Sequence, residues 1–390
     1  MSFIPSAIDF LKTGTKTAGH FGFRDLEEIR AERKLLTSEE KFSHTASAND
    51  RRTDALHGML TSGVCSYLDH KLYAGGEPAL FYTTNTVPRT GETAISLQVL
   101  GVEKSIAESL LIQTVRALLE NLGYHDHSIR INSLGDQESV ARYIRELTNF
   151  MRKRIDDLPI PARELMKEHV FSALMYLIEK DHELVSRSPS PLEYLSDPSR
   201  KHFREVVEFL DMSAAPYEID SKLLGHHQCY SDALFAMDLN DFKARGEEQP
   251  LYIRGGRYNA FVSRVSKTTV PAAGAVIVLR GRKAPQNMPK PRRAATPSIF
   301  MVQLGFGPKV RSLLLMHELH RAGVPVLQDI VNDSLSAQLL KAEAVGARYA
   351  VIIGQKEFVD GSVILRNLTA RSQEHVPMSG LTGHLKRLVR

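Results

Sequence analysis

Long apolar runs, cysteines and a leader-like start are all missing from this chain of 390 residues. No apolar stretch approaches the about eighteen residues that a membrane-spanning helix needs. The only two cysteines, Cys65 and Cys229, are too few for a disulfide framework. Residues 1–19 lack both the basic start with a long apolar stretch and the cleavage site of a signal peptide. These absences favour a cytoplasmic protein that does not enter a membrane, and the length favours two or three domains.

Positive charge is concentrated toward the C-terminal end of the chain. Residues 280–390 contain 17 lysines and arginines against 7 aspartates and glutamates, whereas residues 1–279 contain 33 basic and 38 acidic residues. Clustered positive charge is typical of surfaces that contact phosphates. The sequence therefore predicts a C-terminal part that binds a polyanion, with an ordinary solvated surface as the alternative.

The clearest boundary between domains is the stretch 281–297. It contains four prolines, no acidic residue and no periodic apolar pattern, which predicts an extended and semi-rigid linker. Its basic residues either contact RNA or only keep the linker solvated: Arg282, Lys283, Lys290, Arg292 and Arg293. We expect one domain over 1–280 and another over 298–390.

Strands and helices alternate after this linker. Four runs are typical of strands: 299–304, 325–328, 349–353 and 362–368. A mostly apolar helix is expected over 308–321, and a second helix begins at an Asp333–Ser334 cap and stops at Gly346. This alternation predicts an α/β layer with a mainly parallel sheet.

The first 280 residues have a different order of elements. An amphipathic helix is expected over 105–122 and a strand over 129–132, and the pattern from about 137 to 211 is almost wholly helical. Strand patterns return at 217–220, 232–238, 250–253 and 274–279. Strands, a helical insertion and then strands again predict an α+β domain built on an antiparallel sheet.

Five short stretches resemble segments of histidyl-tRNA synthetase, a class II aminoacyl-tRNA synthetase, in the order of that family: 96–103, 132–135, 255–259, 321–324 and 350–357. The third stretch, GGRYN, is similar to the GGRYD turn that precedes the family's motif 3. The resemblance covers nearly the whole chain. It implies an α+β class II domain over 1–280 with a helical insertion at about 137–211, then an α/β anticodon-binding domain over 298–390. It also implies a homodimer, with tRNA as the partner.

The resembled family activates an amino acid with ATP and magnesium. An amino-acid carboxylate meets the α-phosphate of ATP, so the site must neutralise clustered negative charge. Arginine does this best through its planar fork of donors, and Mg²⁺ bridges the phosphates. An active member would therefore bind ATP and Mg²⁺ and carry arginines at set positions.

Two of these arginine positions are altered here. The family's motif 2 corresponds to residues 86–92, with a shorter loop in which Arg89 is the candidate remnant. Motif 3 has Gly281 in place of the arginine that packs on ATP, flanked by Arg280 and Arg282. A shift of one residue along a strand turns a side chain to the other face. If the protein is an active ligase, Arg89, Arg280 and Arg282 are the candidate catalytic residues.

The segments that bind histidine in the family are altered as well. Leu224 takes the position of an arginine beside the bound histidine, and residues 57–61 keep only Thr61 of the segment that binds its amino group. The proline that motif 1 carries at the dimer interface does not follow residues 21–29. These changes predict a fold that persists without histidine activation.

A remnant of the substrate pocket is expected from the residues that the resemblance keeps or places there: Thr61, Glu103, His226, His227, Gly255, Gly256, Arg257 and Tyr258. His226 and His227 with Cys229 suggest zinc, because imidazole and thiolate are its usual ligands. The spacing matches no standard closed zinc site, so we expect no metal.

Three functions remain open. The favoured one is a catalytically inactive tRNA-binding or regulatory paralogue. The second is a divergent but active histidine–tRNA ligase. The third is a partner-binding scaffold like the regulatory subunit of ATP phosphoribosyltransferase, a family that usually lacks a recognisable anticodon domain. In the C-terminal domain, Lys341 and Arg348 are the candidate RNA contacts, alongside the basic residues of the linker.

Overall fold

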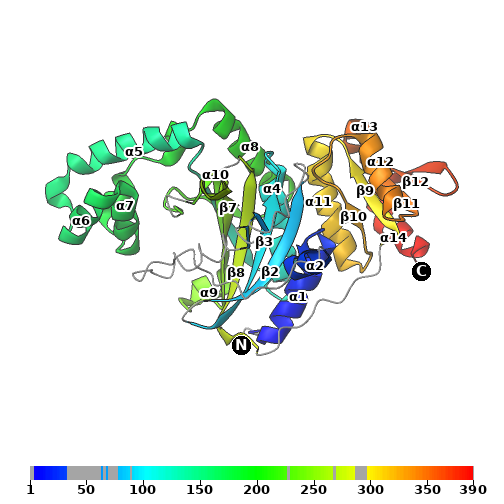
Figure 1. Ribbon diagram of the computed structural model, residues 1–390, viewed down its shortest axis with the longest axis horizontal. Coiled ribbons are helices and arrows are strands. Elements are labelled where there is room, and N and C mark those ends of the chain that lie inside the picture. Colours follow the sequence, from blue (N-terminus) through cyan, green and yellow to red (C-terminus); the bar gives the residue numbers. More distant parts are fainter. Residues whose placement is uncertain are drawn as a thin grey trace.

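The computed structural model describes residues 4–32, 63–64, 67–68, 78–87, 90–225, 229–266, 269–285 and 297–389. Their strands form two sheets (Figure 1). The first has eight strands in the order β1-β2-β3-β8-β7-β6-β4-β5, and the second has five in the order β10-β9-β11-β12-β13. The first sheet comes from the chain before the 281–297 stretch, apart from the end of β8, and the second comes from the chain after it.

The strands of the first sheet are β1 (Arg24–Asp25), β2 (Ala79–Thr86), β3 (Glu92–Leu100), β4 (His127–Ser133), β5 (Tyr217–Ile219), β6 (Ser231–Leu239), β7 (Leu251–Arg257) and β8 (Ala272–Lys283). From β2 to β4 every neighbouring pair is antiparallel. Only the short edge strands β1 and β5 pair in parallel. The predicted α+β domain on an antiparallel sheet is confirmed.

Helices α1 (Ala7–His20) and α4 (Ile106–Asn121) cover one face of this sheet, while α2 (Leu26–Glu32), α9 (Asn240–Arg245) and α10 (Asn259–Ser266) lie around it (Figure 1). Alternate strand residues such as Ile95, Leu97 and Ile129 are buried in the same core as the leucines of α4. Because side chains alternate along a strand, the residues between them point to the opposite face. The helix predicted over 105–122 is confirmed.

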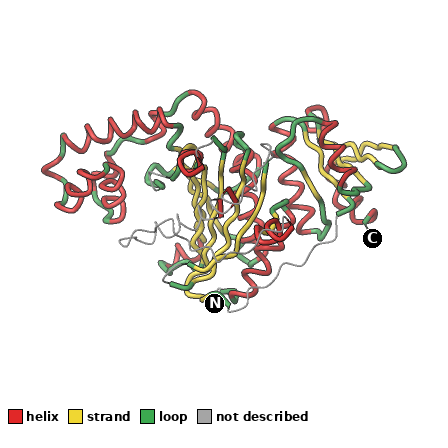
Figure 2. Tube along the Cα trace, viewed as in Figure 1, coloured by secondary structure: helices red, strands yellow, loops and turns green. Residues whose placement is uncertain are grey.

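The chain from Gln137 to Met212 forms only helices and turns, as its sequence predicts. The elements are α5 (Gln137–Arg152), η1 (Ile155–Asp157), α6 (Ile160–Glu168), α7 (Val170–Glu179), η2 (Glu183–Arg187), η3 (Pro191–Tyr194) and α8 (Asp197–Met212). The carboxylate of Asp136 caps α5 by accepting the Ser139 amide at 2.8 Å. Figure 2 shows α5 to α7 as a helical lobe on the side of the sheet away from the C-terminal domain.

The second sheet and its helices form the α/β domain. They are β9 (Ile299–Gln303), α11 (Phe306–Arg321), β10 (Leu327–Gln328), α12 (Leu335–Ala344), β11 (Tyr349–Ile353), α13 (Gln355–Asp360), β12 (Ser362–Asn367), β13 (Ser372–Pro377) and α14 (Met378–Leu388). Ser334 caps α12, as its position in the sequence predicts. Helices α11 and α14 share a core with one face of the sheet, and α12 packs on the other.

The prediction of a mainly parallel sheet in this domain was wrong. Strands β10, β9 and β11 are parallel, but β12 and β13 are antiparallel to their neighbours. The connection 354–361 is shorter than the roughly a dozen residues that a parallel crossover needs, and a turn ending at Arg371 (φ 54°) joins β12 to β13. No helix in the described part of the chain is long and apolar enough to cross a membrane.

Candidate functional site

The face of the first sheet that points away from α1 and α4 contains a row of polar side chains. In the pairing register, Arg130 of β4 is opposite Ala236, Ala236 is opposite Arg254 of β7, and Arg254 is opposite Val276, which pairs with Ser96. Asp238, Tyr252 and Arg280 share this face, because each lies an even number of residues from a member of the row. We call Ser96, Arg130, Asp238, Tyr252, Arg254 and Arg280 the site face.

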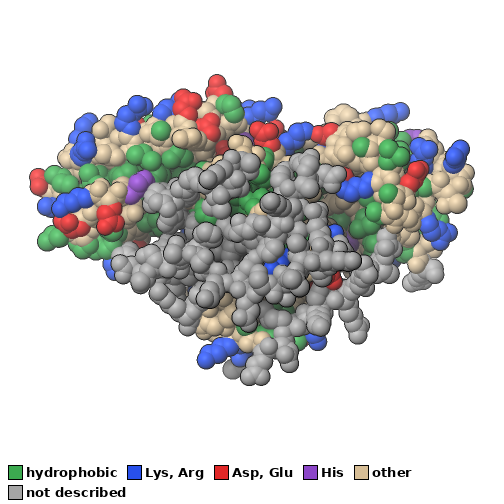
Figure 3. All heavy atoms as spheres, in the orientation of Figure 1, with side chains coloured by type: hydrophobic (Ala, Val, Ile, Leu, Met, Phe, Trp, Pro, Cys, Tyr) green, Lys and Arg blue, Asp and Glu red, His purple; other side chains and the backbone are tan. Residues whose placement is uncertain are grey.

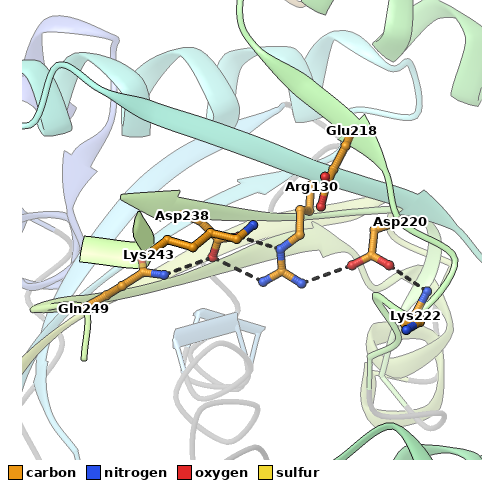
Figure 4. A pocket seen from close by; sticks show the side chains of 7 residues that line it. All are labelled: Arg130, Glu218, Asp220, Lys222, Asp238, Lys243 and Gln249. Atoms are coloured by element: carbon orange, nitrogen blue, oxygen red, sulfur yellow. Dashed lines mark hydrogen bonds and ion pairs between the residues drawn. The ribbon is translucent and has the colours of Figure 1, made fainter. Parts of the chain in front are cut away.

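A charged groove lies at the outer end of the site face, beside β4, β5 and β6 (Figure 4). Its volume is about 510 Å³, and its lining residues are Arg130, Glu218, Asp220, Lys222, Asp238, Lys243 and Gln249. Arg130 lies between two carboxylates, with Nε 2.6 Å from Asp238 and Nη1 3.1 Å from Asp220. Burial raises the pKa of Asp238, but the Arg130 hydrogen bond and charge outweigh it and leave that pKa below its usual range. The groove is therefore lined by charges of both signs that largely neutralise each other.

Tyr252 lies at the centre of the site face, between two arginines. The Cζ atoms of Arg254 and Arg280 lie 5.7 and 5.3 Å from the centroid of its ring. Arg254 donates to the Leu224 carbonyl at 3.0 Å, and Arg280 pairs with the exposed Glu248 at 3.1 Å. Burial raises the pKa of the Tyr252 hydroxyl, so it stays protonated and neutral. The hydroxyl of Ser96, farther along the face, is buried and has no hydrogen-bond partner among the described residues.

Arg257, a residue of the predicted pocket remnant, lies inside the protein. Its side chain is 1% exposed, and Nε and Nη2 each lie 2.7 Å from a carboxylate oxygen of the fully buried Glu108. It also donates to the carbonyls of Val102 (2.9 Å) and Lys104 (3.2 Å). Burial raises the pKa of Glu108, yet the charges of Arg257 and His202 outweigh it and lower that pKa. Arg257 thus ties β7 to the start of α4 inside the protein.

The other pocket-remnant residues in the described part of the chain are structural or exposed. Tyr258 is fully buried and its hydroxyl donates to Gln98. A Cβ at Gly255 would lie 2.4 Å from the Phe235 ring, and one at Gly256 would lie 2.6 Å from the Ala233 carbonyl. Residues of β6 therefore leave no room for a side chain at either glycine of β7. Glu103 is exposed in the loop before α4.

The altered motif positions have well-defined structural roles. Leu224 is 3% exposed in the core. Gly281 adopts a left-handed backbone (φ 68°) near the end of β8, and its amide donates to Glu92 at 2.9 Å. Of its neighbours, Arg280 contacts Tyr252 on the site face, whereas Arg282 and Lys283 are exposed at the strand end.

Several predicted residues lie outside the described residues: Thr61, Arg89, His226, His227, Lys290, Arg292 and Arg293. Cys65 also lies outside them, while Cys229 is buried. No group of three or more potential metal ligands occurs in the ranges that the structure describes.

In the C-terminal domain, the two predicted RNA contacts are both exposed. Lys341 pairs with Asp329 at 2.8 Å, and Arg348 lies 5.7 Å from the centroid of the Tyr349 ring. Lysines and arginines (blue) are visible at several places over this domain, at the right of Figure 3.

The β12–β13 hairpin presents a polar face that sequence analysis missed. Pairing places Arg366 beside Gln373 and Ile364 beside His375, on the same side of the sheet as α12, whose core includes Ile364 at its edge. Gln373 and His375 are exposed, and Arg366 is half-buried. The alternation of buried Val363 and Leu365 with these outward residues was the available signal.

Comparison with known proteins agrees with this architecture. A family model described as an anticodon binding domain matches residues 312–388. A histidine–tRNA ligase of Halalkalibacterium halodurans is 26% identical over 341 residues, which cover 83% of this chain and 78% of that protein. One of Halothermothrix orenii is 23% identical over 376 residues, covering 92% and 85%. The crystal structure of apo Staphylococcus aureus histidyl-tRNA synthetase superimposes with a TM-score of 0.50 and 17% identity, over 95% of this chain and 93% of that one.

The fold is that of a class II synthetase-like α+β domain followed by an α/β anticodon-binding domain. The chain is similar to histidine–tRNA ligases over most of its length.

Proposed function

We propose that the protein binds tRNA through its C-terminal domain and does not activate histidine. The observation that supports inactivity is the structure at the end of β8. Where the resembled family carries an arginine that packs on ATP, Gly281 has a left-handed backbone that holds its amide on Glu92. A side chain at this position would strain the backbone, and Leu224, the second altered position, is enclosed in the core. The backbone at position 281 thus favours glycine, and the core around position 224 encloses an apolar side chain.

Binding of tRNA is supported by the match of residues 312–388 to an anticodon binding domain and by the excess of basic residues after position 280. We infer that the RNA contacts Arg348 together with the open β12–β13 face, through Arg366, Gln373 and His375. Guanidinium groups pair with RNA phosphates, unpaired bases stack on imidazole planes, and amides read the base edges. The proposed partner is thus a single-stranded loop of a tRNA, bound by a protein that we place in the cytoplasm as a homodimer.

Two measurements on the full-length protein test this proposal. Binding of bulk tRNA is measured across a range of salt concentrations, because phosphate contacts make affinity fall steeply with salt. Exchange between ATP and pyrophosphate is measured with histidine. We expect salt-sensitive tRNA binding and no exchange above background. Failure to bind tRNA at low salt would reject the first half of the proposal, and robust exchange would reject the second.

A divergent active ligase is the second candidate, and the site face is the observation that favours it. Arg254 and Arg280 lie beside the Tyr252 ring, Arg130 lies at the outer end of the same face, and Ser96 has a buried hydroxyl without a partner among the described residues farther along it. Such a face offers positive charge to a phosphate. If exchange is found, Arg280→Ala is expected to abolish it, whereas Arg282→Ala, whose side chain is exposed at the strand end, should retain it.

A further inference from the structure

The C-terminal domain packs on the core through α11, which lies against α1 and α4 (Figure 1). Four histidine and amide contacts join these helices. The Nε2 atom of His20, the last residue of α1, lies 2.9 Å from the Met316 carbonyl. Asn121 of α4 brings its Nδ2 atom 2.7 Å from Nε2 of His320 and 3.0 Å from the Thr17 hydroxyl. His317 pairs with Glu120 at 2.9 Å. The interface is therefore rich in groups that can change charge.

The hydrogen bonds fix where the protons are. A side-chain amide nitrogen can only donate, so Nε2 of His320 must accept from Asn121 and cannot hold a proton. A carbonyl oxygen can only accept, so Nε2 of His20 must donate to Met316. The rings of His20 and His320 lie 4.5 Å apart, centroid to centroid. A proton added to Nε2 of His320 would turn that atom from an acceptor into a donor that faces the Asn121 donor. It would also place a positive charge beside the His20 ring.

The surrounding charges add to this effect. Lys16 and His20 face His320 from α1, Arg116 and Glu120 lie on α4, and His317 and Arg321 lie on α11 itself. Glu120 is the one carboxylate among them, and it pairs with His317. Burial lowers the pKa of His20. Burial, together with the neighbouring His20, His317 and Lys16, lowers the pKa of His320 to about 4.

We propose that neutral His20 and His320 position the anticodon-binding domain on the core, and that protonation of this pair releases it. The contact is an acid-sensitive latch between the two domains. In the docked state the Asn121 contact requires a neutral His320, and burial lowers the pKa of His20, whereas in a released domain both imidazoles titrate near the ordinary pKa of about 6.5. The latch is therefore fully formed above about pH 6.5 and is progressively lost as the pH falls from there toward 4.

One contact opposes release and one does not respond to this pH range. His317 of α11 contacts Glu120 of α4 across the interface at 2.9 Å, and this contact favours docking. Asp333 bridges Lys104 of the core and Lys309 of α11, and its lowered pKa keeps it charged throughout. Acid removes the acceptor that His320 offers to Asn121 and adds charge beside the buried His20, so acid is expected to loosen the interface.

Small-angle X-ray scattering of the full-length protein tests the latch, with the radius of gyration followed from about pH 7.5 to pH 4.5. For the native chain we expect the radius to increase as the pH falls. His320→Gln keeps a polar side chain that cannot titrate, and should shift the midpoint down by at least about one pH unit. Asn121→Asp gives the imidazolium a carboxylate acceptor, and should hold the domains together in acid. His384→Gln, in α14 and paired with Glu374, is the matched control and should behave like the native chain.

Far-UV circular dichroism on the same samples separates release from unfolding. The proposal is supported if the radius increases while the helical signal persists, and if His320→Gln delays that increase. It is overturned if the native radius stays constant over this range, if His320→Gln opens at the native pH, or if helical signal is lost together with the change in radius. None of these outcomes depends on RNA binding, so the latch and the proposed function can fail separately.

Discussion

Removing the guanidinium of Arg257 is expected to destabilise the core more than any other single arginine change on the first sheet. The Arg257→Ala substitution leaves the buried carboxylate of Glu108 without the two 2.7 Å bonds that balance its charge. It also removes the Arg257 hydrogen bonds to the carbonyls of Val102 and Lys104, although Lys104 keeps the amide of Ala107 as a donor. Breaking a buried ion pair from one side costs about 3–5 kcal/mol, because the remaining charge stays buried, here with His202 still 2.8 Å from it.

Two further variants test whether the loss of stability comes from the buried charge of Glu108 that Arg257 balances. Arg254→Ala, three residues earlier on the same strand, removes one bond to the Leu224 carbonyl and should cost only about 0.5–1.5 kcal/mol. Replacing both partners with apolar residues, as Arg257→Met with Glu108→Leu, removes the buried charge and should recover most of the loss.

Urea unfolding followed by far-UV circular dichroism measures these differences, with hydrogen exchange of amides in α4 and β7 assigning the transition to the core. The reasoning is refuted if Arg257→Ala costs less than Arg254→Ala, or if the double variant is no more stable than Arg257→Ala. Either result would mean that Arg257 is not the buried structural partner that its contacts indicate.

Three other predictions follow from the same structure. Burial lowers the pKa of His202, but the charge of Glu108 outweighs burial and raises that pKa. The stabilisation that the His202–Glu108 pair contributes is therefore present below about pH 6.5 and is lost as the pH rises through the raised pKa. His202→Gln should flatten this part of the stability profile measured by urea unfolding. Gly255→Ala pushes a methyl group against Phe235 and should lower the free energy of unfolding by about 1–3 kcal/mol in thermal unfolding. Its control is Gly380→Ala, in a helix and with nothing within 4 Å of the added Cβ, which should be neutral or stabilising by up to about 1 kcal/mol. Arg348→Ala with Arg366→Ala should reduce the salt slope of tRNA binding by about 1.4, at roughly 0.7 per lost phosphate contact, and an unchanged slope would remove this face from the RNA interface.

The fold was largely predictable because its signals are local. Ser334 and Gly346 mark the ends of α12, and the leucines of α4 repeat at helical spacing. β13 was missed because Val376 is its only buried residue, so it shows no alternation to detect. The direction of β12 depends on the length of its connection to β11, which apolar patterns do not report.

The site was less predictable because it depends on pairs of residues that are distant in sequence. Arg257 lies in a stretch that resembles a family motif, and the sequence placed it in a pocket. Its partner Glu108 lies 149 residues earlier, and only the packing of β7 on α4 brings the two together. In the same way, the placement of Arg130, Arg254 and Arg280 on one face with Tyr252 follows from strand register, which the sequence does not specify.

The most direct test of the central claim is ATP–pyrophosphate exchange by the native full-length protein, measured with each amino acid in turn and with a histidine–tRNA ligase of known activity as the positive control. The account predicts no exchange above background with histidine, from a preparation that binds tRNA in a salt-sensitive way. Robust exchange that depends on histidine would contradict it.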